Sequence, residues 1–337
     1  MGAGTSALAG VPTFGNFYET AEDICKNNLA DGEEKKLFED VLKHWHKNFR
    51  DHDIEQYYAL IEMNEDLGTN PHDSDNIITT GKIRDFIFYT IQQSLQINTS
   101  RKEQSKRIFE EFFEHIGGSR SAIITTNWDT ILEAFSKRSF GSVDYEGKIK
   151  PYNKEAIKQG PPLHILKLHG SLNWGICNEC KKEIYHFKEM VDKKALCDVT
   201  CGNCKTKKFV TKLIPPTLVK LTKKEPDELV DIWKKAHEYI KSCQEIYFIG
   251  YSFPETDVQM KVFISNVLMD NKLNKICVVS NQKHGYSKVD FEERYLSILP
   301  KHNHSKIMFY YEGFEEFYKK LPDFRQEDKS YASLDDW

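Results

Sequence analysis

The chain has 337 residues, of which 39% are hydrophobic and 29% are charged, and its formal net charge is −4. Such a chain can bury a sizeable core, its length suggests about two structural units, and its charge gives no overall reason to expect nucleic-acid binding. It has no apolar run of about 18 residues, and it begins with a glycine-rich turn instead of a basic stretch followed by an apolar one. We therefore expect neither a membrane span nor a signal peptide, and we predict a cytoplasmic protein.

The chain opens on a loop of small residues. The run from Gly2 to Ala7 fits the pattern Gly-x-Gly-x-x-Gly/Ala, in which small residues let the backbone approach a pyrophosphate and the next helix stabilises its charge. A plain glycine turn would have the same sequence, so the pattern is weak by itself. Such a loop normally follows a β-strand, and only Met1 precedes it here, so we expect an added upstream strand to stabilise it.

Apolar residues recur at helical spacing between about residues 17 and 120. The runs Leu37 to Phe49, Ile83 to Leu95 and Ile108 to Ile116 each place apolar side chains every three or four positions. They predict amphipathic helices whose aromatic side chains form a core instead of contacting a cofactor. Residues 17–120 are therefore interpreted as a helical insertion.

Short β-rich runs begin near residue 121 and alternate with helical patterns such as Leu229 to Cys243. Nearly continuous apolar runs are typical of parallel strands that are covered on both faces. The sequence therefore predicts an α/β fold with a Rossmann-like, doubly wound parallel sheet. The predicted strands are Ala122 to Thr125, His164 to Leu168, Phe209 to Ile214, Glu245 to Ile249, Lys275 to Val279 and Ile307 to Tyr310.

Polar residues with useful chemistry follow two of these strands. Asn127 and Asp129 come after the run ending at Thr125, and His169 comes after Leu168. The carboxyl ends of parallel strands form the usual ligand crevice, and a histidine can accept a proton there from a ribose hydroxyl or from water. The alternatives are an Asx-turn that starts a helix at Thr130 and a structural turn at His169.

Two Cys-x-x-Cys pairs, separated by twenty residues, suit a tetrahedral zinc site. The ligands would be Cys177, Cys180, Cys201 and Cys204, and because they fill all four positions the metal should be structural. Cys197 is a surplus thiol nearby, so its replacement of Cys201 stays open. Residues 181–224 contain twelve lysines and four acidic residues, which indicates either a solvated lysine-rich module or a docking face for an acidic partner or nucleic acid.

In this order, the glycine loop, the run Thr126 to Asp129, the His169-Gly170 pair and the cysteine pairs resemble the landmarks of sirtuin-like proteins. The resemblance spans most of the chain and implies NAD⁺ as substrate and structural Zn²⁺. It implies that His169 is the general base, that Asn127 contacts the nicotinamide ribose and a water, and that Asp129 orients the loop. The cofactor-binding residues that it implies are Gly2, Ala3, Gly4, Ser6, Pro12, Phe14, Thr126, Gly250, Ser252, Asn281, Gly313 and Phe314.

The chain departs from sirtuin deacylases at two segments. Thr13 and Gly15 stand where the deacylase cofactor loop has an aspartate and an arginine, and the segment from Leu213 to Lys220 lacks the glycine and acid that bind substrate peptide. The run from Gly250 to Asp257 looks more like that of bacterial antiphage-defence NADases. We therefore predict an NAD⁺ glycohydrolase that depletes NAD⁺; the alternatives are an NAD-dependent protein deacylase and a non-catalytic NAD or ADP-ribose sensor.

The predicted organisation is a discontinuous NAD-binding Rossmann domain with two inserted units and a tail. The domain comprises residues 1–16, 121–176 and 205–322, with the helical insertion at 17–120, a small zinc-ribbon module at 177–204 and a polar tail at 323–337. We expect a homo-oligomer and a partner such as an ATPase or another defence-system subunit. Nucleic acid would be contacted only through a partner or through the basic residues 181–224.

Overall fold

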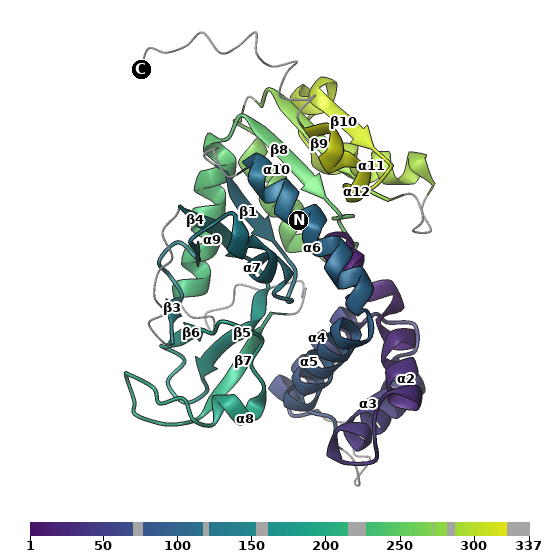
Figure 1. Cartoon of the computed structure of the whole chain (residues 1–337), viewed down its shortest axis with the longest axis vertical. Helices are drawn as coiled ribbons and strands as arrows, with labels where there is room; N and C mark the ends of the chain where they lie inside the picture. Colours follow the sequence, from purple (N-terminus) through teal and green to yellow (C-terminus); the bar gives the residue numbers. More distant parts are fainter. Residues whose placement is uncertain are drawn as a thin grey trace.

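The computed structural model describes residues 1–69, 77–116, 121–152, 161–214, 227–271, 273–281 and 287–321. Figure 1 shows strands flanked by helices, with a helical unit from the first third of the chain beside them. Two of the segments considered above lie outside the described residues: the polar tail at 323–337, and residues 215–220 of the segment that departs from the deacylase peptide-binding sequence.

The described residues form two three-stranded parallel sheets, which confirms the predicted α/β class. The strand orders are β1-β4-β2 and β10-β9-β8. Thr125 pairs with Lys167 in the first sheet, and Val279 pairs with Ile249 and Tyr310 in the second, so the carboxyl ends of neighbouring strands are aligned. The strands are β1 (Ala122–Thr125), β2 (Ser142–Asp144), β4 (Pro162–Lys167), β8 (Glu245–Ile249), β9 (Lys275–Val279) and β10 (Ile307–Tyr310).

The first two residues lie between these sheets and bond to both. The Met1 nitrogen donates to the Ile124 carbonyl at 2.7 Å, and the Met1 carbonyl accepts from the Thr126 nitrogen at 3.4 Å. On the other side, the Gly2 nitrogen donates to the Ile249 carbonyl at 3.0 Å. These bonds bring the carboxyl ends of β1 and β8 to the two sides of one loop, so the two sheets share a single edge there.

The run Phe209 to Ile214 does form a strand, β7 (Phe209–Leu213), but its predicted place in the parallel sheet is wrong. It pairs antiparallel with β5 (Gly170–Cys177) in a separate sheet of order β3-β6-β5-β7, with β3 at Lys150–Pro151 and β6 at Ile184–His186. Gly170 turns the chain from β4 into β5 with φ of 77°, and a Cβ atom there would lie 2.3 Å from the Lys212 carbonyl oxygen. Close approach to a neighbouring strand therefore requires this glycine.

Four helices form the helical unit, and their aromatic side chains build a core as predicted. Trp45 stacks on Tyr57 with ring centroids 5.0 Å apart, and Phe38 lies 4.8 Å from Phe86. The next helix, α6, crosses in front of the sheets in Figure 1 and packs there through Phe109 and Phe112. The four helices of the unit are α2 (Phe17–Asn27), α3 (Glu33–Phe49), α4 (Ile54–Leu67) and α5 (Thr80–Ile97), and α6 spans Thr99–Ile116.

The remaining helices connect and cover the strands. Trp233 of α9 donates from its indole to the Leu168 carbonyl at 3.2 Å, which fixes this helix against the end of β4. Among the helices that the structure describes, none is both long and apolar enough to cross a lipid bilayer. These helices are α1 (Ala3–Ser6), α7 (Ile131–Phe135), α8 (Lys193–Leu196), α9 (Asp227–Ser242), α10 (Val258–Leu268), α11 (Lys288–Ile298) and α12 (Phe314–Phe317).

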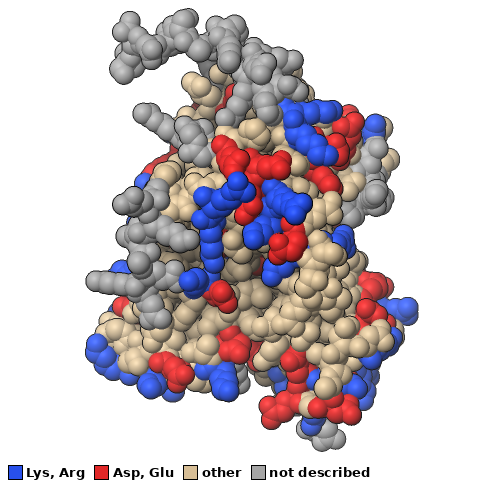
Figure 2. Space-filling view, in the orientation of Figure 1, with Lys and Arg blue, Asp and Glu red and all other residues tan. Residues whose placement is uncertain are grey.

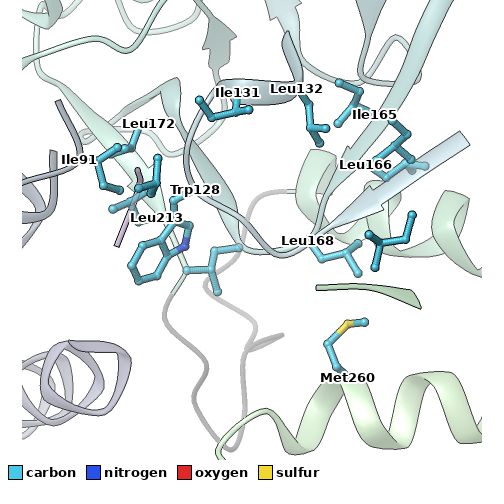
Figure 3. Packing of buried hydrophobic residues seen from close by; sticks show 14 of the residues in the cluster. Ile91, Trp128, Ile131, Leu132, Ile165, Leu166, Leu168, Leu172, Leu213 and Met260 are labelled. Atoms are coloured by element: carbon cyan, nitrogen blue, oxygen red, sulfur yellow. The ribbon is translucent and has the colours of Figure 1, made fainter. Parts of the chain in front are cut away.

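Apolar side chains continue the core beneath the shared sheet edge. Figure 3 shows Trp128, Leu172, Leu168 and Met260 among the buried members of this core. Trp128 accepts a backbone hydrogen bond from Leu172 at 2.8 Å, and its side chain is 4% exposed. The residues at the strand ends are therefore supported by close packing below them.

We expect Gly250→Ala to destabilise the fold by about 1–3 kcal/mol, because alanine there combines an unfavourable left-handed backbone with a steric clash. Gly250 has φ of 62°, and its Cβ would lie 2.5 Å from the Thr5 nitrogen. Gly147→Ala is the matched control, since Gly147 has φ of 63° and nothing within 4 Å of such an atom. Urea unfolding should show the larger loss for Gly250→Ala; equal losses would mean that the contact with the loop contributes nothing.

Candidate functional site

The predicted site residues lie at the carboxyl ends of the parallel strands. Asn127 follows β1 and His169 follows β4, while Gly250 follows β8, Asn281 follows β9 and Gly313 follows β10. The loop from Gly2 to Ser6 lies between the first group and the second, because Met1 before it bonds to the β1 side while Gly2 and Gly4 bond to the β8 side. This edge is where open α/β sheets usually bind ligands.

Asn127 ties the end of β1 to the glycine loop. Its side-chain nitrogen donates to the Gly2 carbonyl at 3.0 Å and to the Ser6 hydroxyl at 2.8 Å, and its backbone nitrogen donates to the Thr125 hydroxyl at 3.1 Å. The residue is 7% exposed. The amide therefore orders the loop as well as standing at the predicted ligand edge.

Two hydrogen-bonding groups hold the Asp129 carboxylate. One carboxylate oxygen accepts from the Ile131 nitrogen at 2.9 Å, which is the Asx-turn that starts α7, and the Ser6 hydroxyl also bonds to this carboxylate. Burial raises the pKa of Asp129, while the nearby Lys167 ammonium opposes that rise. Lys167 itself contacts the Asp129 carbonyl and lies 2.9 Å from Glu133.

His169 is held by its own backbone. Its carbonyl accepts from the Trp128 indole at 3.0 Å and from the Ile214 nitrogen at 2.8 Å, and the residue is 1% exposed. The left-handed turn at Gly170 then leads the chain into β5. The backbone of His169 is therefore held at the edge of the sheet.

Sequence reasoning gave no role to Asp257, which the structure brings to His169. Its Oδ2 lies 3.6 Å from the His169 Nε2, and it accepts from the Tyr251 hydroxyl at 2.6 Å. Burial, followed by the charge of Asp257, raises the pKa of Tyr251 well above its ordinary value, so this hydroxyl stays a donor. The visible signal was an aspartate before an apolar helix, which predicts only a helix N-cap.

Gly2 and Gly4 lie close to Gly250, a contact that the sequence did not predict. A Cβ on Gly2 would lie 2.7 Å from the Gly250 carbonyl, and one on Gly4 would lie 2.9 Å from the Gly250 Cα. The Gly4 nitrogen also donates to the Gly250 carbonyl at 2.9 Å. Gly2 and Gly4 therefore let the chain close on the turn after β8. Gly4 itself lies within α1, the four-residue helix from Ala3 to Ser6 that Gly2 precedes.

The other predicted cofactor contacts fall into two groups. Thr126 and Phe14 lie on the β1 side, where the Phe14 and Trp128 rings are 6.0 Å apart, and Pro12 precedes them in the chain. Asn281 pairs with Glu312 beside Gly313 on the β9–β10 side. The Ser252 carbonyl lies 3.5 Å from Arg294, and Phe314 packs in the core on Phe109 at 5.3 Å.

The four cysteines of the two pairs converge. Their sulfurs all lie within 4.8 Å of one another, with Cys177 3.5 Å from Cys204 and Cys180 3.6 Å from Cys201. Cys197 is exposed and is not part of this group, whereas Cys201 is fully buried within it. The donor set is consistent with structural zinc, and these four residues would hold the ion.

Charged side chains are mixed on the surface. In the face that Figure 2 shows, Lys and Arg lie among Asp and Glu. Of the basic residues 181–224, those from 215 onward lie outside the described residues, and Lys208 in the described part pairs with Glu179 at 2.8 Å. The docking face therefore stays a prediction.

No family profile matches the chain, and no curated protein matches its sequence. Solved structures of Sir2 homologues are similar to it across nearly its whole length at low sequence identity. A mutant Sir2 homologue in complex with ADP-ribose is 13% identical, with a TM-score of 0.46 over 98% of this chain and 91% of that chain. A Sir2 homolog in complex with NAD is also 13% identical, with a TM-score of 0.42 over 97% of this chain and 87% of that chain.

Proposed function

We propose that this chain is an NAD⁺ glycohydrolase that converts NAD⁺ and water to nicotinamide, ADP-ribose and a proton. The observation that carries the proposal is the placement of Asn127, His169 and the Gly2 to Ser6 loop at one edge of the parallel sheets. The loop would hold the pyrophosphate, and the two side chains would face the nicotinamide ribose.

The chemistry needs few groups. When the bond between nicotinamide and ribose breaks, nicotinamide leaves with the bonding electrons and positive charge develops on the ribose ring, as in other glycosyl transfers. Water then attacks the ribose carbon, and His169 accepts the proton that this water releases. Asn127 would position the water and the ribose through its amide, which the loop already orients.

Two features favour water over an acyl-lysine as the nucleophile. The sequence from Leu213 to Lys220 lacks the glycine and acid with which deacylases bind a substrate peptide. Thr13 and Gly15 also replace the acid and arginine of the deacylase cofactor loop. The resemblance of residues 250–257 to defence proteins further supports NAD⁺ depletion as the biological outcome, in a homo-oligomer or with a partner subunit.

We expect purified protein to release nicotinamide and ADP-ribose from NAD⁺ without any acylated peptide. Chromatographic product analysis with and without an acetyl-lysine peptide is the measurement. Nicotinamide that appears only with the peptide, together with O-acetyl-ADP-ribose, would identify a deacylase instead. Because a defence effector can require an activating partner, the assay is repeated with candidate neighbouring subunits; tight NAD⁺ binding without turnover in every combination would identify a sensor.

A further inference from the structure

We propose that Asp257 is a positioning residue that orients the His169 imidazole and stabilises its protonated form. The catalytic consequence of this pairing rests on the proposed NAD⁺ cleavage, but the pairing itself does not. The Asp257 Oδ2 lies 3.6 Å from the His169 Nε2, and the two side chains are 2% and 1% exposed. Burial keeps the interaction between these groups from being screened by salt.

Both oxygens of the Asp257 carboxylate are held by groups other than His169. Oδ1 accepts from the Met260 nitrogen at 3.4 Å as the N-cap of α10, and Oδ2 accepts from the Tyr251 hydroxyl at 2.6 Å. The Tyr251 carbonyl in turn accepts from the Tyr295 hydroxyl. Met260 and Tyr251 therefore fix the orientation of the carboxylate independently of His169, so the carboxylate can orient the imidazole.

The buried charges on the β1 and β4 side are largely paired among themselves. Lys167 lies 2.9 Å from Glu133 and interacts electrostatically with Asp129, and all three are buried on the β1 and β4 side. Asp257 comes from the other sheet, through the turn after β8. It is thus the carboxylate whose contact is with the imidazole.

A carboxylate at Nε2 selects one form of the histidine. It favours the tautomer that carries its hydrogen on Nε2, so that Nδ1 is the basic nitrogen, and it stabilises the imidazolium that forms when Nδ1 takes the proton from water. In this step the proton goes to Nδ1 and not to Asp257. Removing the Asp257 carboxylate should therefore change both the rate of NAD⁺ cleavage and the pH at which His169 titrates.

Asp257→Asn and Asp257→Ser test this pairing without removing the helix cap, because asparagine and serine are both good N-caps. We expect each to lower NAD⁺ cleavage by about 10²-fold, the typical cost of misplacing a reacting group. A matched control is Asp53→Asn, since Asp53 caps α4 in the helical unit by accepting from the Gln56 nitrogen at 2.8 Å. The control should cleave NAD⁺ at the original rate.

The decisive readout is the NMR titration of the His169 imidazole in histidine-labelled protein, identified by the signal that His169→Ala removes. Loss of the neighbouring negative charge should move the titration midpoint of His169 to lower pH in Asp257→Asn, and the acid limb of the rate profile should move with it. An unchanged midpoint would overturn the proposal even if the rate fell. A shifted midpoint in a protein that never cleaves NAD⁺ would support the pairing and reject the glycohydrolase function.

Discussion

His169→Ala is expected to lower the rate of NAD⁺ cleavage by about 10²- to 10⁴-fold, because the variant loses the group that accepts the proton from water. The fold should survive the change. The hydrogen bonds that fix this residue, from the Trp128 indole and the Ile214 nitrogen, end on its backbone carbonyl and do not involve the imidazole. Product analysis at saturating NAD⁺ and a thermal unfolding curve together check both parts of the expectation.

His164→Ala provides the matched control, since His164 lies on β4, the strand that His169 follows, but pairs with Glu146 at 2.7 Å. It should cleave NAD⁺ at the original rate. Equal activity of His169→Ala and the unmutated chain would remove His169 from the mechanism.

Asn127→Ala should damage activity to a similar degree for a partly different reason. The Asn127 amide supplies hydrogen bonds to Gly2 and Ser6, so its loss should loosen the loop and raise KM as well as lower kcat. The Gly2 carbonyl keeps the Thr5 nitrogen and hydroxyl as donors, so the cost is that of the lost hydrogen bonds, about 0.5–1.5 kcal/mol each, and this variant should unfold at a lower temperature than His169→Ala.

Five of the six strands of the parallel sheets could be predicted because their sequences are mainly apolar runs, whereas β2, with the sequence Ser-Val-Asp, gave no such signal. Ala122–Thr125 and Lys275–Val279 are strands with the predicted bounds. β5 was missed because polar residues interrupt it. Ser171 and Asn173 are buried there only because Ser171 donates to Asn173 at 2.7 Å and Asn173 donates to the Phe187 carbonyl at 2.8 Å. Such bonds cannot be seen in a hydropathy pattern.

The sequence also did not predict the direction in which β7 pairs. An apolar run predicts a strand but not its partner, and β7 pairs with β5 because the Gly170 turn sends the chain back beside it. For the site, the rule that ligands bind at the carboxyl ends of parallel strands grouped Asn127 with His169. That rule does not predict the contact between Asp257 and His169, because this contact depends on where α10 begins relative to β4.

Zinc removal is expected to unfold the module around β5 and β7, because the module has little core without its ligands. Its buried cluster comprises six residues, two of which are the ligands Cys177 and Cys201; the others are Val191, Leu196, Val199 and Phe209. Structural zinc typically contributes about 10–16 kcal/mol of apparent binding free energy to such small modules. We therefore expect one zinc per chain by metal analysis, and loss of amide protection across residues 177–209 after chelation.

Cys201→Ser removes a predicted zinc ligand, and Cys197→Ser is its control because it removes a nearby cysteine that is not a ligand. Cys201 is buried within the sulfur group and Cys197 is exposed outside it, so only the first change should release the metal. The effect should reach the candidate active site, because β7 ends beside Ile214, whose nitrogen donates to the His169 carbonyl at 2.8 Å. A zinc-free chain that keeps its fold, with all four cysteines of the pairs titrating freely, would show that the cluster is not a metal site.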